Sequence, residues 1–248
     1  MPMHTTDRIN IICNWINNYA KKNETKPFNL VIGVSGGIDS AVTSALCAKT
    51  NLKTIVVSMP IRQNKKQHKL SLEHIDWLKL NFNNIDSYII ELDEVFKFFK
   101  NKMDIFQSDL AFANSRSRLR MLTLYQIAQS SNALVVGTGN KVEDFGIGFF
   151  TKYGDGGVDI SPIADCTKTQ VWDMGKILKI PKNIIDAKPT DGLWDDSRND
   201  LDQIGLQYEQ LEEAMENPNS KYFEKYNEIR KPNLHKMNPI PICKFKDN

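Results

Sequence analysis

The sequence predicts an α/β fold in which a parallel β-sheet is covered by helices on both faces. Short apolar runs alternate with amphipathic stretches through the first half of the chain, which is the pattern of repeated strand–helix units. Several of these runs end in glycine-containing or polar turns, and the carboxyl ends of parallel strands are where such folds bind ligands. We therefore expect a single Rossmann-like domain over residues 1–248, with its site at that edge of the sheet.

The spacing of apolar residues assigns the elements in order. Ile9, Ile12, Ile16 and Tyr19 recur at helical spacing, so the first element is an amphipathic helix. The predicted strands are residues 30–34, 54–59, 87–92 and 133–137. The other predicted helices are 39–49, 65–81, 95–100, 109–129, 167–178, 206–215 and 222–230. Residues 145–160 and 188–202 are predicted to be long loops, because they are rich in glycine or in polar residues with proline and glycine.

Composition excludes several classes of partner. A net charge of +2 gives no electrostatic case for a nucleic-acid partner. The N-terminus lacks an apolar signal core, and no stretch approaches the roughly 20 apolar residues of a membrane span. The 4 cysteines are far apart and form no C-x-x-C pair, which favours reduced, buried thiols in a cytoplasmic protein over a metal cluster or disulfides.

The turn after the first strand has the sequence SGGIDS, at residues 35–40. Two adjacent glycines let backbone N–H groups approach a ligand closely, and the start of the next helix adds partial positive charge. Such a turn binds phosphate, although it lacks the lysine of a Walker loop.

Four further motifs follow. They are VVGTGNKVED at 135–144, FFTKYGDGGVD at 149–159, KPTDGLW at 188–194 and the pair His235-Lys236. The SGGIDS turn is the pattern of the ATP pyrophosphatase, or PP-loop, superfamily. With the other four motifs in this order, the chain resembles the ammonia-dependent NAD synthetases from about residue 7 to residue 236. The resemblance implies the adenine nucleotide alpha hydrolase-like fold of that superfamily.

The resemblance also implies a reaction, the last step of NAD biosynthesis. Nicotinic acid adenine dinucleotide (deamido-NAD), ATP and ammonia would give NAD, AMP and pyrophosphate through an acyl-adenylate. The chain is too short to hold the extra amidase domain of the glutamine-dependent relatives, so free ammonia is the expected nitrogen source. The ATP-binding residues implied are Gly33, Val34, Ser35, Gly36, Gly37, Ile38, Asp39, Ser40, Thr138, Lys168 and Thr190.

Charge development during attack on ATP calls for Mg²⁺ and a lysine. Asp39 and Glu143 are oxygen ligands at two strand ends and are the predicted metal ligands, although a helix-start acid and a solvated acid are the plain alternatives. Lys168 lies in a first helical turn, where a cation is disfavoured, so a phosphate partner is predicted over a surface role. By resemblance Asp155 would bind ammonium and take its proton, and ordinary turn chemistry is the alternative.

The residues implied for deamido-NAD binding are Arg118, Lys152, Asp159, His235 and Lys236. Arg116, Arg118 and Arg120 spread around one helix, so at most one or two reach substrate; Arg118 is favoured, then Arg120, and a solvated surface is expected for the rest. Helix 109–129 is apolar on more than one face. The resemblance implies that this excess is buried in a symmetric homodimer whose interface holds the dinucleotide.

Two other classes remain open from the residues alone. One is a PP-loop enzyme that adenylates a tRNA base, which would favour a basic face and catalytic cysteines. The other is a non-catalytic adenine-nucleotide module, which would leave the last three motifs without a purpose. Pyrophosphate release that depends on deamido-NAD would separate all three.

Overall fold

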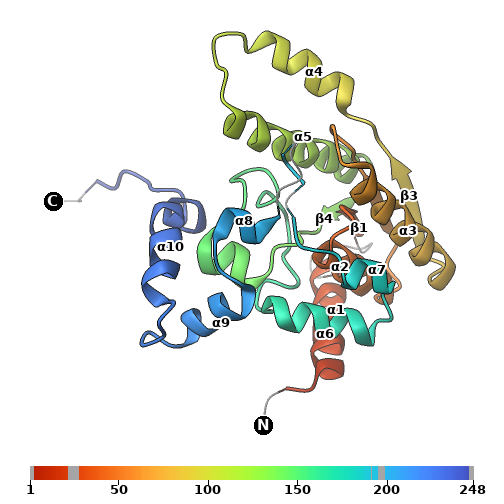
Figure 1. The fold of residues 1–248 in the computed structure, drawn as a ribbon. Coiled ribbons are helices and arrows are strands. Elements are labelled where there is room, and N and C mark those ends of the chain that lie inside the picture. Colours follow the sequence, from red (N-terminus) through yellow and green to blue (C-terminus); the bar gives the residue numbers. More distant parts are fainter. Residues whose placement is uncertain (1–2, 22–27, 191, 195–198, 246–248) are drawn as a thin grey trace.

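The computed structural model describes residues 3–21, 28–190, 192–194 and 199–245 (Figure 1). Its four strands are all parallel and lie in the order β3-β2-β1-β4. They are β1 (Asn29–Gly33), β2 (Thr54–Ser58), β3 (Ile85–Ile89) and β4 (Ala133–Val135). Val31 of β1 pairs with Ile55 on one side and with Val135 on the other. The predicted α/β class with a parallel sheet is confirmed.

The helices fall into a sheet-covering set and a C-terminal set. The first set is α1 (Thr5–Lys21), α2 (Ile38–Lys49), α3 (Lys65–Asn81), α4 (Asp93–Lys102), α5 (Asp109–Ser130), α6 (Lys168–Ile177) and α7 (Lys182–Ile185). The second set is α8 (Asp200–Ile204), α9 (Tyr208–Glu216) and α10 (Phe223–Met237). Between the sets lies η1 (Lys141–Ile147), a π-helix.

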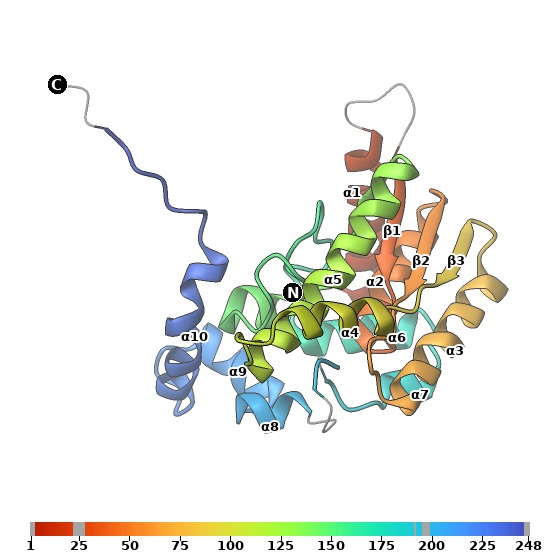
Figure 2. The same cartoon turned by 90° about the horizontal axis from the view of Figure 1, so that it is seen from above.

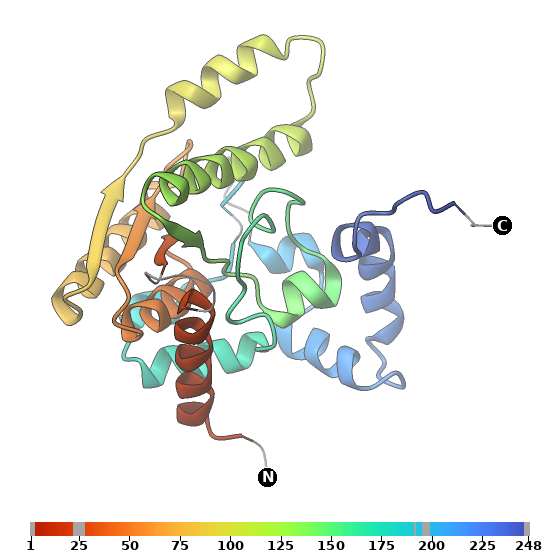
Figure 3. The same cartoon turned by 180° about the vertical axis from the view of Figure 1, so that it is seen from behind.

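The two faces of the sheet are covered by different helices. Leu30 and Ile32 of β1 pack into a core with α1, α2, α3 and α6, whereas Val31 packs into a second core with α4 and α5. This alternation follows from the two-residue period of a strand. Figure 2 shows α5 running alongside β1, and Figure 3 shows α1, in red, on the back of the molecule.

A third apolar cluster joins η1 to the C-terminal helices. Its buried members from η1, α9 and α10 are Val142, Ile147, Tyr208, Leu211, Ala214 and Tyr226. Figure 1 shows these helices beside the sheet, to the left of α6 and α1. The cluster therefore attaches the C-terminal part of the chain to the segment that carries Glu143.

The structure differs from the sequence prediction in several places. The predicted 145–160 loop begins inside η1, and α7 was not predicted. The helix predicted at 222–230 extends to Met237 through Pro232, because Asn233 bonds Ile147 O and Ile229 O and so anchors the far side of the proline. Strand β3 begins at Ile85, two residues before its predicted start. The 188–202 prediction overruns the start of α8, and its residues 191 and 195–198 lie outside the described residues.

The structure also bears on the cysteines and on the possibility of a membrane-spanning helix. Cys13, Cys47 and Cys166 are buried and free, as predicted, but Cys243 is exposed. Among the helices of the described ranges, none has both the length and the apolar character that a membrane crossing requires.

Candidate active site

The phosphate-type turn lies between β1 and α2. Gly36 has φ +91°, and a Cβ there would lie 2.7 Å from Gln67 O and 2.9 Å from Ser71 N, so only glycine fits. The hydroxyls of Ser35 and Ser40 close the turn: Ser40 Oγ donates to Gly37 O at 3.0 Å and accepts from Ser35 N at 3.2 Å. The turn is therefore rigid, and α2 starts immediately after it at Ile38.

A lysine lies between the two predicted metal ligands. Lys168 Nζ is 2.5 Å from Asp39 Oδ2 and 2.8 Å from Glu143 Oε1, and its side chain is only 2% exposed. Burial alone would lower the pKa of Lys168, but the charges of Asp39 and Glu143 outweigh burial and raise it. The two carboxylates thus converge on one cation, and the surface alternative for Lys168 is wrong.

The second strand-end turn positions Glu143. Asn140 is fully buried; its Oδ1 accepts from Val142 N and Glu143 N, and its Nδ2 donates to Asp39 Oδ1 at 3.2 Å. One amide side chain therefore caps η1 and ties it to the first residues of α2. Because Glu143 is in a helix and is only 14% exposed, the solvated-acid alternative is wrong.

The loop after η1 holds Asp155 by its carboxylate. Asp155 Oδ1 accepts from Ser117 Oγ at 2.7 Å and from Thr151 N at 2.9 Å, while Asp155 N donates back to Ser117 Oγ at 2.8 Å. A Cβ at Gly154 would lie 2.3 Å from Ser117 Oγ, so the chain needs glycine next to the acid. Asp155 is therefore part of an ordinary glycine-containing turn, and its carboxylate is also held in a fixed position by hydrogen bonds.

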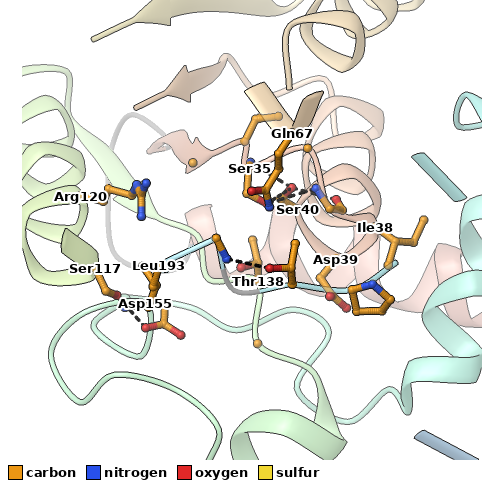
Figure 4. Close-up of a pocket in the computed structure, with 18 of the residues that line it drawn as sticks. Ser35, Ile38, Asp39, Ser40, Gln67, Ser117, Arg120, Thr138, Asp155 and Leu193 are labelled. Carbon is orange, nitrogen blue, oxygen red and sulfur yellow. Dashed lines mark hydrogen bonds between the residues drawn. The ribbon is translucent and has the colours of Figure 1, made fainter. Parts of the chain in front are cut away.

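These groups line one pocket of about 430 Å³ (Figure 4). We call the lining residues predicted for ATP and metal the ATP side; they are Gly33, Val34, Ser35, Gly36, Gly37, Ile38, Asp39, Ser40, Thr138, Glu143, Lys168 and Thr190. Asp155 lines the same pocket together with Ser117 and Arg120 of α5. The structure therefore brings together every residue predicted for ATP, metal and proton transfer.

The residues implied for deamido-NAD do not line this pocket. We call them the dinucleotide side: Arg118, Lys152, Asp159, His235 and Lys236. Lys152 Nζ donates to His235 O at 3.0 Å, and Lys236 Nζ donates to Phe150 O at 2.8 Å. Arg118 Nε donates to Lys152 O at 3.2 Å. These contacts join α5, the 148–159 loop and α10 into one half-exposed surface.

Asp159 and Lys236 differ from the rest of the dinucleotide side in their surroundings. Asp159 Oδ2 accepts from Val135 N at 2.8 Å and Oδ1 accepts from Tyr125 hydroxyl at 3.1 Å, so this carboxylate closes the β4 edge. Burial lowers the pKa of Lys236, against the opposing charges of Asp155 and Asp144. Lys236 therefore lies within electrostatic reach of the pocket.

The three arginines of α5 point in three directions. Arg116 was expected on a solvated surface, but it is 6% exposed, its Nη1 donates to Leu193 O at 2.9 Å, and its guanidinium lies over Phe96. Arg118 is exposed, whereas Arg120 donates from Nε to Met59 O at 3.0 Å and lines the pocket. Of the three, Arg120 is the one in the pocket lining.

Sequence reasoning missed two residues beside the carboxylates. Tyr208 hydroxyl lies 2.5 Å from Glu143 Oε1 and 2.7 Å from Asp200 Oδ2. Burial, with the charges of Glu143 and Asp200, raises the pKa of Tyr208, so its hydroxyl stays protonated. Both residues lie in a polar C-terminal stretch with no motif, and only the apolar spacing of α9 hinted that Tyr208 faces inward.

Comparisons with known proteins agree with this geometry. A family model described as NAD synthase matches residues 8–242. A curated NH(3)-dependent NAD(+) synthetase from Mesoplasma florum is 37% identical over 214 residues, which are 85% of this chain and 84% of the relative.

Two solved structures resemble the fold over nearly the whole chain. The NMN synthetase from Francisella tularensis has a TM-score of 0.90 and 33% identity, and the match covers 98% of this chain and 100% of that one. The NH3-dependent NAD synthetase from Campylobacter jejuni has a TM-score of 0.78 and 24% identity, with the same coverage, which is a likeness of fold.

Proposed function

The chain belongs to the NAD synthase family, and we propose that it converts deamido-NAD, ammonia and ATP to NAD, AMP and pyrophosphate. It is a ligase, as its curated NH(3)-dependent relatives are. The observation that carries the proposal is the convergence of the SGGIDS turn, two carboxylates and Asp155 on one pocket. ATP needs a phosphate cradle, and amide formation needs a group that accepts a proton from ammonium.

The ATP side fits nucleotide phosphates. The N–H groups at the start of α2 and the Gly36-Gly37 backbone favour anions. Asp39 and Glu143 would hold Mg²⁺, because both are oxygen donors and both already lie within 2.8 Å of one cation, the Lys168 ammonium. No group of three or more acidic, histidine or cysteine ligands occurs in the described parts of the chain, so phosphate oxygens would complete the coordination.

The first chemical step needs help with negative charge. The carboxylate oxygen of deamido-NAD attacks the α-phosphorus of ATP, the bond to the β-phosphate oxygen breaks, and pyrophosphate leaves. Lys168 would stabilise the charge on the phosphoryl oxygens from the floor of the pocket. Bound Mg²⁺ would add Lewis-acid stabilisation of the same oxygens. Thr138 and Thr190, which both line the pocket, would contact the nucleotide.

The second step needs neutral ammonia. At neutral pH the nitrogen source is mostly ammonium, which has no free electron pair, so the site must bind a cation and remove a proton. Asp155 is the proposed acceptor, since Ser117 Oγ and Thr151 N fix its Oδ1 at the pocket edge. Ammonia then attacks the acyl carbon, the bond between that carbon and the phosphate oxygen of AMP breaks, and AMP leaves with the electron pair. The new amide nitrogen loses its surplus proton to solvent.

The dinucleotide side is proposed to bind deamido-NAD in a homodimer. Its residues are surface groups of one protomer, so a second surface is needed to enclose a long ligand. Helices α4 and α5 supply apolar surface for an interface: Phe98, Leu110 and Leu122 are 68%, 59% and 62% exposed. Such an interface would be isologous and would bury more than about 2,000 Å².

A second candidate substrate is nicotinic acid mononucleotide, which lacks the adenylyl half of deamido-NAD. The Francisella protein with TM-score 0.90 is titled an NMN synthetase, and its fold is nearer to this chain than that of the Campylobacter NAD synthetase at 0.78. The chemistry at the pocket would be the same. Only the number of contacts required from the dinucleotide side would change, because the mononucleotide is shorter.

One assay separates these functions. Purified protein with ATP, Mg²⁺ and ammonium is given deamido-NAD, nicotinic acid mononucleotide, bulk tRNA or no acceptor, and pyrophosphate and the amide product are measured. We expect the highest kcat/KM with deamido-NAD, and no amide when glutamine replaces ammonium. A higher kcat/KM with the mononucleotide would establish the second candidate. Turnover with tRNA alone, or with no acceptor, would overturn both.

A cytoplasmic location is proposed as well. Cys13, Cys47 and Cys166 are buried and free, and burial raises the pKa of Cys166 to about 11, which keeps it an unreactive thiol. Unpaired cysteines are usual where thiols are kept reduced.

A further inference from the structure

We propose that Tyr208, held by Asp200, is a positioning residue that fixes Glu143 for cation binding and so links the C-terminal helices to the nucleotide site. The proposal rests on the proposed function in one respect, since it takes Glu143 as a metal ligand. Tyr208 is absent from the pocket lining and acts through the carboxylate.

The hydroxyl of Tyr208 engages one specific oxygen of Glu143. It donates to Oε1 at 2.5 Å, and Lys168 Nζ also contacts Oε1 at 2.8 Å. No donor to Oε2 is found in the described part of the chain. With Oε1 held, the side chain cannot turn about its last torsion without breaking both contacts, so the orientation of the Glu143 carboxylate is fixed.

The ring of Tyr208 is fixed on its other sides. It is 7% exposed, packs edge-on against Trp172 with ring centroids 5.8 Å apart, and has Lys168 Nζ 4.7 Å from its centroid. Asp200 Oδ2 lies 2.7 Å from the hydroxyl, and Asp200 is itself 4% exposed. Packing from α6 holds the ring, and the hydroxyl lies between Glu143 Oε1 and Asp200 Oδ2, which share its single proton.

A bound cation would affect the Tyr208 contact with Glu143 and the Lys168 contact with Glu143 differently. Lys168 Nζ joins Asp39 to Glu143, which is where a metal shared by the two carboxylates would also lie. A metal would therefore compete with the ammonium for these oxygens. Tyr208 approaches from α9 and makes no contact with Asp39, so it is the donor to Glu143 that a cation does not replace.

The same cluster offers a matched control. Tyr226 of α10 is 6% exposed, and its hydroxyl donates to Gly146 O of η1 at 3.1 Å. Tyr226→Phe therefore removes a buried hydroxyl bonded to the same helix, but one that does not touch Glu143. A merely structural role for Tyr208 predicts equal effects of the two substitutions.

The experiment compares Tyr208→Phe, Asp200→Asn, Tyr226→Phe and wild type as full chains. Mn²⁺ binding in the presence of a non-hydrolysable ATP analogue is followed by electron paramagnetic resonance, and melting temperatures are recorded in parallel. We expect a Mn²⁺ Kd about 10-fold or more higher for Tyr208→Phe, a smaller rise for Asp200→Asn, and no change for Tyr226→Phe. The Mg²⁺ concentration for half-maximal rate should rise by a similar factor, with a smaller fall in kcat.

The outcomes are distinguishable. Wild-type Mn²⁺ affinity in Tyr208→Phe overturns the positioning role, and so does an equal loss in Tyr226→Phe. Absence of Mn²⁺ binding by wild type overturns the metal assignment, and with it this proposal. If Tyr208→Phe does not fold, Asp200→Asn decides between the two readings by the same shift in Mn²⁺ Kd.

Discussion

The ATP side and the dinucleotide side are built from the same chain in different ways. On the ATP side, Lys168, Asp39 and Glu143 are bonded to one another across three elements, and Asn140 ties two of those elements together. On the dinucleotide side, polar atoms such as Lys152 Nζ and Lys236 Nζ bond mainly to backbone carbonyls. The first set of residues is therefore bonded together within one chain, whereas the second is a surface.

This difference matches the different demands of the two parts of the proposed reaction. Phosphate and metal chemistry requires charges held at fixed positions, and a sheet edge supplies that rigidity. Recognition of a long acceptor requires area, and area is available where α5 and α10 face outward. Perturbing the two sides should therefore give different kinds of loss.

The largest effect is expected at the centre of the ATP side. Asp39→Asn removes one charge while keeping an oxygen near Lys168, so kcat should fall at least about 100-fold through lost charge stabilisation. The melting temperature should change little, because Glu143 still pairs with Lys168. Asp165→Asn, at an acid whose side chain is 95% exposed, is the control. An Asp39→Asn enzyme with normal kcat at ordinary Mg²⁺ would remove Asp39 from the metal site.

The next effect tests the surface nature of the dinucleotide side. Leu110→Glu with Leu122→Glu places charges on the exposed face of α5, and we expect a monomer in place of twice 28.4 kDa. The kcat/KM for deamido-NAD should fall about 10-fold or more, while ATP binding is retained. Light scattering after size exclusion gives the mass, and Leu80→Glu on α3 is the control. A fully active monomer would refute the shared site.

A smaller effect is expected where the two sides meet. Ser117→Ala removes the hydroxyl that orients Asp155, and the KM for ammonium should rise about 10-fold, as for loss of a hydrogen bond to a charged group. The Kd for ATP should not change. Ser115→Ala, on the same helix but bonded to Ala111 O, is the control. Equal behaviour of the two variants would show that Asp155 does not handle ammonium.

The smallest effect on activity concerns the scaffold under the ATP side. His74 is buried, bonds Ser44 of α2 through Nε2 at 2.9 Å, and burial lowers its pKa to about 4 from 6.5. Between these values the unfolded chain binds a proton that the folded chain does not, so stability is full above pH 6.5 and falls as pH drops toward 4.

Urea unfolding at pH 7 and pH 5 measures this contribution. Wild type should lose about 2 kcal/mol between the two pH values that a His74→Gln variant does not lose. Activity at pH 7 should be unaffected. Parallel losses in the two proteins would show that His74 titrates normally in the folded state.

The structure gathers the residues predicted for ATP and metal in one pocket and leaves those predicted for deamido-NAD outside it, for a physical reason. Residues such as Asp39 and Glu143 lie in short motifs directly after strands, and parallel pairing brings strand ends together. Tyr208 and Asp200 could not be found this way, because their position depends on how α8 and α9 pack on η1. Arg116 was assigned to a solvated surface because helical spacing alone does not show that Leu193 O and the Phe96 ring lie next to its guanidinium.

The predicted limits of two elements were wrong because contacts with distant parts of the chain outweighed local sequence preferences. Gly146 and the motif glycines suggested a loop from residue 145, yet Asn140 caps the segment and its packing against α10 keeps it helical. The last helix was predicted to end at residue 230, yet α10 continues through Pro232 to Met237, and Asn233 holds the chain on η1 beyond the proline. In both cases a contact between η1 and α10, which are far apart in the sequence, determines where the helix begins or ends.

The sheet order β3-β2-β1-β4 also orders events during synthesis. Strands β1, β2 and β3 and their helices leave the ribosome first and can pair in sequence, but β4 must return to β1 after a segment that contains α4 and α5. Asp39 and Asn140 are 101 residues apart, and Lys168 is 129 residues from Asp39. A nascent chain that ends before β4 thus carries the glycine turn without the Asn140 and Lys168 partners of Asp39, and the ATP side is complete only when α6 has emerged and docked.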